Sequence, residues 1–199
     1  MRRLFLILSV AALGVGFASK RQATVVSDPT PTPIVEEIGY TGRHAIFNPL
    51  RNHTVEEKEA VAKAEVLVNA VIDSYCFEQF FLSRGLIQTD GRTADQVVKH
   101  IRLIKELAVP VEMYYDRFSR VVGYRQLPSL TIYTNRKFHA GTYVKDRASN
   151  LGHEWLHSVG YGHDFKATKR RPYSVPYSFN AAMEECPACK SINNCFIKN

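Results

Sequence analysis

The segment LGHEWLHSVGYGHD, residues 151–164, holds three histidines and one glutamate at spacings suited to metal chemistry. His153 and His157 are four residues apart, so a helix would place both imidazoles on one face, about 6 Å apart along its axis. Two such rings can ligate one metal ion. Glu154 would lie on a neighbouring face, where its carboxylate can reach a water molecule on the metal without being a ligand. The spacing therefore predicts two metal ligands and a general base.

A third histidine can reach the same metal ion if the chain turns back after the helix. Gly160 can adopt the left-handed conformation that ends a helix, which would return His163 towards the helix. Three protein ligands leave one tetrahedral position for water, and that distinguishes a catalytic zinc from a closed structural one. We therefore expect hydrolysis of a peptide bond and one Zn²⁺ per chain, bound by His153, His157 and His163.

The alternative is a helix whose histidines merely face solvent. Five fixed positions arise by chance on the order of once in ten million starting points, which favours the metal site. His153, Glu154, His157, Gly160 and His163 match the pattern HExxHxxGxxH in full, and on these residues the chain resembles the metzincin zinc endopeptidases. The resemblance implies an upper subdomain of sheet and helices, a horizontal cleft, and a short C-terminal subdomain after the third histidine.

The resemblance also implies supporting roles for two residues beyond the motif. Asp164 follows the third histidine, as in the adamalysin-like branch, where this acid helps to fix the lower subdomain. No subfamily is assigned from this one residue. Met183 is the only methionine downstream and is the candidate for the methionine turn beneath the zinc. The tyrosine that follows this methionine by two residues in the family is absent, because position 185 is Glu.

Two tyrosines and one strand complete the expected site. Tyr173 and Tyr177, in the segment RRPYSVPYSF, are candidates to approach the metal or stabilise the transition state, and the alternative is aromatic packing in a Pro-rich turn. The strand expected at 130–138, or the HAGTY segment after it, would resemble the edge strand on which metzincins bind an extended substrate. His100 and His139 lack ligand spacing to the cluster and are expected in core or solvent roles.

Helical and strand patterns alternate in blocks along the chain. Capping boxes and apolar residues at helical spacing predict helices at 55–74 and 94–107, and the motif itself lies on a helix at 147–160. Segments rich in β-branched and aromatic residues predict strands at 109–115, 121–125 and 130–138. This order favours an α+β fold with helices packed on a small mixed sheet, and the resemblance implies that this fold is zincin-like. Trp155 and Leu156 are expected to bury the active helix against that sheet.

The N-terminus resembles a secretory signal. Arg2 and Arg3 precede an apolar run of 14 residues, whereas a transmembrane span needs about 20. We expect a signal peptide at 1–18 with cleavage after Ala18, an extended Pro/Thr-containing arm or linker at 19–46, and one catalytic domain at 47–199. The protein is then secreted or periplasmic, without a membrane span after signal removal.

The net charge and its distribution along the chain indicate which binding partners to expect. The formal charge is +7 and becomes +5 without the signal, and nothing resembles a nucleic-acid-binding module. The expected partner is a protein or peptide substrate, and the expected state is a monomer. One basic segment, with Lys166, Lys169, Arg170 and Arg171, either attracts acidic substrates or keeps a loop soluble, and the pattern favours the soluble loop.

Four cysteines fit an exported chain: Cys76, Cys186, Cys189 and Cys195. They allow two disulfides in three connectivities, and because three of them crowd the last fourteen residues, Cys76 can pair only by tying an early segment to the C-terminus. A zinc knuckle built from the last three is the alternative. At the level of function, the alternatives to the protease are a zinc-containing secreted binding or toxin-like module without proteolytic turnover, and a structural secreted protein.

Overall fold

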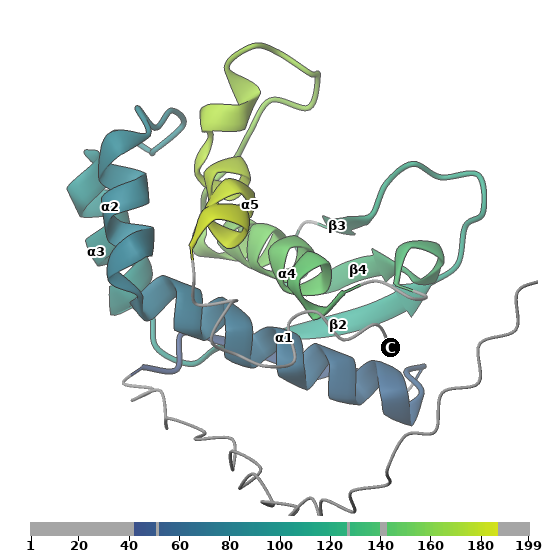
Figure 1. Cartoon of the computed structure of the whole chain (residues 1–199). Coiled ribbons are helices and arrows are strands. Elements are labelled where there is room, and N and C mark those ends of the chain that lie inside the picture. Colours follow the sequence, from purple (N-terminus) through teal and green to yellow (C-terminus); the bar gives the residue numbers. More distant parts are fainter. Residues whose placement is uncertain (1–41, 51, 127, 140–142, 187–199) are drawn as a thin grey trace, which may run out of the picture. The chain divides into compact units, whose positions relative to one another are not determined.

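Figure 1 shows the computed structural model of the chain, which describes residues 42–50, 52–126, 128–139 and 143–186. All of these residues belong to one unit of the chain. The expected signal peptide, residues 19–41 of the expected arm, and the cysteines Cys189 and Cys195 lie outside the described residues. Within them, no helix has both the length and the apolar character needed to cross a membrane.

The fold is mixed α+β, with a small open sheet and five α-helices in the described part, which confirms the coarse class. The sheet order is β1-β2-β4-β3; β1 and β4 run parallel to β2, and β3 runs antiparallel to β4. In chain order the elements are β1 Ala45–Pro49, α1 Val55–Asp73, α2 Tyr75–Ser83, α3 Ala94–Leu103, β2 Leu107–Tyr114, β3 Gly123–Arg125, β4 Ile132–Asn135, η1 Arg136–Phe138, α4 Val144–Val159, η2 Arg171–Tyr173 and α5 Val175–Glu185.

The two expected capping boxes begin α1 and α3. Thr54 and Glu57 exchange side-chain and backbone hydrogen bonds at the start of α1, and Thr93 and Gln96 do the same for α3. The expectation that α3 continues to residue 107 is wrong. It ends at Leu103, because the chain turns through Glu106, whose φ is 52°, and enters β2.

The first strand lies partly inside the segment that the sequence assigns to the arm. β1 begins at Ala45, two residues before the expected start of the domain. The buried Asn69 side chain on α1 holds it, accepting from the backbone N–H groups of His44 and Ala45 at 2.7 and 2.9 Å and donating to the Ala45 carbonyl at 2.9 Å. This long-range clamp, rather than a local strand pattern, places β1 beside β2.

Helix α4 lies between the sheet and α5, and α1 packs beside it (Figure 1). Trp155 and Leu156 are fully buried, and the Trp155 indole donates to the Leu107 carbonyl of β2 at 3.3 Å, so the expected anchor of helix α4 on the sheet is confirmed. On the opposite side, the missing side chain of Gly152 allows the ring of Phe179 on α5 to approach closely. The site helix is therefore held on both sides.

A disulfide joins Cys76 on α2 to Cys186 at the end of α5. It ties an early segment to a late one, as expected. Because Cys186 is consumed in this bond, the zinc-knuckle alternative is wrong. The bond instead fixes α5, which carries one wall of the site described next.

Candidate metal centre

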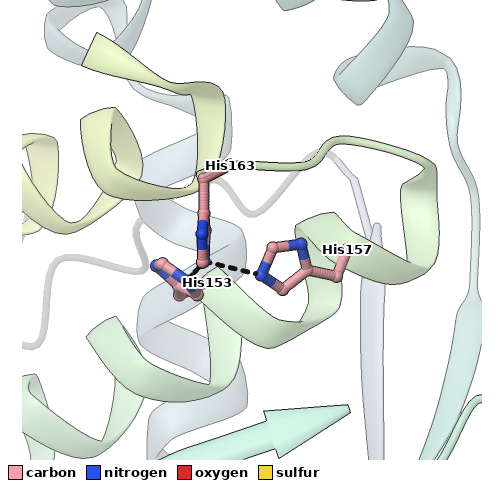
Figure 2. Close-up of side chains that lie close together, drawn as sticks. All are labelled: His153, His157 and His163. Atoms are coloured by element: carbon pink, nitrogen blue, oxygen red, sulfur yellow. Dashed lines mark hydrogen bonds between the residues drawn. The ribbon is translucent and has the colours of Figure 1, made fainter. Parts of the chain in front are cut away.

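The helix α4 presents two of the three motif histidines on one face, as their spacing predicts (Figure 2). Gly160 ends the helix with a φ of 110°, a left-handed value at which a side chain would be strained. The Tyr161 N–H then donates to the Leu156 carbonyl at 3.0 Å and closes the turn. The chain reverses, and His163 points back between His153 and His157.

The three Nε2 atoms converge. His163 Nε2 lies 3.1 Å from His153 Nε2 and 3.2 Å from His157 Nε2, and the potential ligand atoms all lie within 4.8 Å of one another. A tetrahedral zinc with Zn–N bonds of about 2.0–2.1 Å separates its nitrogens by roughly 3.4 Å, which is close to the two short distances. The cluster could therefore hold a metal ion.

The hydrogen bonds behind the rings set the tautomers of two ligands. His157 Nδ1 donates to the Tyr161 carbonyl at 2.7 Å, and His163 Nδ1 donates to the Asp164 carbonyl at 3.1 Å. In a neutral imidazole the other nitrogen then carries a lone pair, so the Nε2 atoms of these two rings face each other lone pair to lone pair. Such a contact is repulsive without a cation between the rings, and this donor set fits a metal.

Burial keeps these rings neutral. It lowers the pKa of His153 to about 3, with the neighbouring histidines adding to the shift, and it lowers the pKa of His157 to about 4. Burial also lowers the pKa of His163, which lies nearer the surface. Metal ligands must be unprotonated, so all three imidazoles are competent near neutral pH. The Nδ1 atom of His153 is buried without a hydrogen bond of good geometry, although the Pro176 carbonyl lies near enough to raise that pKa slightly.

Glu154 is buried beside the cluster and faces the cleft. Burial raises the pKa of its carboxyl to about 7, against the opposing effect of the Arg125 backbone N–H, which donates to it, and of the Arg125 charge. The Arg125 guanidinium also donates to the His157 carbonyl at 2.5 Å. One residue of β3 thus contacts both the expected base and the backbone of a ligand.

The cluster opens into a cleft of about 990 Å³. One wall is formed by residues 120–125, which include β3, and the other by the turn after α4 together with Arg171 and Tyr177. Among the strands that the structure describes, β3 is an edge of the sheet, because it pairs only with β4. The expectation that residues 130–138 form the edge is wrong: β4 lies between β2 and β3. Residues 140–142 of the HAGTY segment lie outside the described residues.

Of the two candidate tyrosines, the structure brings one to the cluster. The ring of Tyr177 packs 4.7 Å from that of His153 and 4.9 Å from that of His163, between ring centroids. Tyr173 is half exposed, stacks with Arg84, and does not line the cleft. Tyr173 ends the short 3-10 helix that contains Pro172, as the alternative of packing in a Pro-rich turn allows, whereas Tyr177 lies within α5.

The two supporting residues have different surroundings. The Asp164 carboxylate accepts from Gln88 at 2.8 Å and from Thr168 at 2.9 Å, so it ties the loop after the third histidine to the segment after α2. Met183 is fully buried in the core. It lies within α5 rather than in a turn, so the helix takes the place of the methionine turn that the resemblance implied.

Two interactions that hold the site in place are not predicted by the sequence. The Tyr161 hydroxyl and His100 Nδ1 are 2.8 Å apart, which anchors the loop carbonyl that orients His157. Arg125 is the second, and nothing in its local sequence distinguishes it from a surface arginine. His100 and His139 are not in the metal cluster, as expected.

Comparison of the chain with models of known protein families, with curated proteins and with solved structures finds no match.

Proposed function

We propose that the protein is a secreted zinc-dependent endopeptidase in which Glu154 activates the attacking water. The observation that carries the proposal is the joint placement of three converging imidazoles and a buried glutamate in a cleft bordered by an edge strand. The Cys76–Cys186 disulfide is compatible with maturation in an oxidising compartment, as export requires.

The donor set favours zinc as the metal. Three neutral nitrogen ligands suit zinc better than calcium or magnesium, which prefer oxygen. His153, His157 and His163 would hold the ion, and no fourth side chain from the described residues joins this cluster. Zinc at this point supplies Lewis acidity towards a carbonyl group and makes a water molecule more acidic.

Glu154 and Tyr177 would have different roles in the reaction. Glu154 takes a proton from the attacking water and passes it to the leaving amine. Burial keeps its carboxylate poorly solvated, and the Arg125 N–H holds it in place beside the cleft. The Tyr177 hydroxyl makes no hydrogen bond to any described residue, so it is available to the oxygen on which negative charge develops.

The edge strand offers a place for an extended substrate. β3 has one side paired with β4, and its other side lines the cleft beside Glu154. Backbone N–H and C=O groups on a free strand edge can pair with a peptide added as a further strand. A chain bound in this way passes the cluster with its own backbone exposed to attack.

Peptide cleavage by purified, zinc-loaded protein tests the proposal. Mass spectrometry of an unfolded protein substrate should show internal cleavage with the wild type and a loss of at least a hundredfold in rate with Glu154→Ala, at unchanged zinc content. Glu59→Ala makes the same change at an exposed position of α1 and should cleave as the wild type. Undiminished cleavage by Glu154→Ala would exclude the assigned base. Absence of cleavage by zinc-loaded wild type would favour a binding or toxin-like module.

A further inference from the structure

The cleft beside the histidine cluster carries more positive charge than the proposed reaction needs. Its charged side chains, histidines aside, are Arg120, Arg125, Arg171 and Glu154. Glu154 is reserved for the reaction, so the walls present three cations and no other carboxylate. In the described part of the chain none of these arginines forms an ion pair.

Arg171 stands out among the three because of how it is held. Its guanidinium lies over the ring of Tyr177, 4.6 Å from the centroid, and Tyr177 packs on two ligand rings. One guanidinium nitrogen reaches the Phe165 carbonyl at 3.4 Å, while Nε is buried without a partner. A buried guanidinium N–H without an acceptor is costly, and a carboxylate is the acceptor that suits the planar guanidinium fork best.

The charges lie on both sides of the metal cluster. Arg171 lowers the pKa values of His153 and His163, and Arg125 lowers that of His157, so each cation is close enough to act on a ligand. Arg125 donates from Nε to the Ser129 carbonyl and from Nη1 to the His157 carbonyl, and Arg120 is an exposed residue of the cleft lining. Arg171 lies on the ring that packs against two of the histidines and has an unmet donor, while Arg120 adds positive charge to the cleft.

We propose that this cleft selects peptides that carry a carboxylate next to the bond over the metal cluster, with Arg171 as the residue that binds the carboxylate. The inference rests on the proposed function for the identity of the cluster, and it adds the class of substrate. The carboxylate has two sources, an acidic side chain within the peptide or the carboxyl terminus of the peptide. In either case the bound group accepts from the Arg171 guanidinium where this side chain lines the cleft.

The segment 166–171 thereby divides into two parts. Lys166, Lys169 and Arg170 are exposed, which agrees with a soluble loop, whereas Arg171 is partly buried and turned to the cleft. Arg170 is therefore a matched control, since it carries the same charge one residue away without lining the cleft.

Binding to a non-hydrolysing protein tests the inference apart from catalysis. Zinc-loaded Glu154→Gln protein would be titrated with fluorescent Ala-rich octapeptides, blocked at both ends, that carry one Glu or one Gln at each position in turn. We expect at least one position at which the Glu peptide binds about tenfold more tightly, with a preference that falls as salt is raised. Equal binding of Glu and Gln peptides at every position, together with equal binding of the free-acid and amide forms described below, overturns the inference.

Variants in the same background assign the preference to one residue. Arg171→Gln should reduce the Glu/Gln ratio to within about twofold of unity, Arg171→Lys should retain most of it, and Arg170→Gln should leave it unchanged. A preference that survives in a folded Arg171→Gln protein contradicts the assignment. A neutral peptide compared as free acid and as amide distinguishes the two sources: tighter binding of the free acid alone identifies the terminal carboxylate. If the preference is found but the wild type hydrolyses nothing, the proposed function fails while this inference stands.

Discussion

His157 Nε2 and His163 Nε2 lie 3.2 Å apart, and the Nδ1–H group of each ring donates a hydrogen bond to a backbone carbonyl. The two lone pairs therefore face each other across the point where a metal would bind. The carbonyls that impose this arrangement belong to Tyr161 and Asp164, which lie in the turn that Gly160 begins. The geometry of the turn is thus part of the metal site.

Gly160→Ala should weaken zinc binding. A side chain at a φ of 110° costs about 1–2 kcal/mol, and the turn can relieve that strain by moving the carbonyl that orients His157. We expect a loss of about tenfold or more in zinc affinity, measured by competition with a chelator. Gly162→Ala is the control, because a Cβ there meets no atom within 4 Å and its φ is not left-handed. Equal affinity of Gly160→Ala and wild type would show that the turn does not set the ligand geometry.

Tyr177→Phe tests the hydroxyl beside the cluster. The ring contacts with His153 and His163 remain, so zinc content and KM should change little, whereas kcat should fall about ten- to hundredfold if the hydroxyl stabilises developing negative charge. Tyr173→Phe serves as the control, since that ring lies outside the cleft. A matching loss in both variants would point to a structural effect on the α5 region.

The contact between α4 and α5 depends on Gly152. A Cβ at this position would lie 2.2 Å from the ring of Phe179, so Gly152→Ala must displace α5 or the ring and should cost about 1–3 kcal/mol of unfolding free energy. Replacing the Phe179 ring by the smaller leucine side chain should relieve the clash. Phe179→Leu should therefore lower the unfolding free energy less in the Gly152→Ala background than in the wild type. Denaturant unfolding of the four proteins measures this coupling, and strictly additive losses would refute the close approach.

His139 makes folding sensitive to acid. Burial, with the charge of Arg147 in support, lowers its pKa to about 4, and Arg147 donates to its Nδ1 at 2.9 Å. In the unfolded chain the pKa is about 6.5, so between pH 6.5 and 4 the unfolded state binds a proton that the folded state does not, and stability falls as the pH falls. The loss from this group at pH 5 is about 2 kcal/mol relative to pH 8. His139→Asn should therefore show a shallower pH dependence of unfolding free energy than the wild type. Identical pH slopes would contradict this assignment.

The local rules of the sequence predicted the cluster. Helical periodicity fixes the relation of His153 to His157, and the left-handed glycine at 160 returns His163, so no distant contact is needed. Helix α1 and the start of α3 followed from their capping boxes for the same reason.

The features that the sequence does not predict depend on contacts between distant residues or on proline, which occurs both in turns and in the first turn of a helix. β1 is held by Asn69, 24 residues away, and β3 rather than β4 forms the edge because strand order is a tertiary property. The prolines of the segment RRPYSVPYSF favour a turn and conceal the start of α5, yet Pro176 lies in the first turn of the helix, where a missing N–H costs nothing. Arg125 reaches His157 across 32 residues.

The measurement that tests the central claim most directly is the zinc content of purified protein at neutral pH, compared with that of His163→Ala. The three-histidine site predicts about one zinc per chain in the wild type and a loss of at least tenfold in zinc affinity in the variant, because two imidazoles remain without the third. His100→Ala is the control at a histidine outside the cluster and should keep its zinc. Zinc well below one per chain in the wild type, or unchanged affinity in His163→Ala, would contradict the metal centre and the protease built on it.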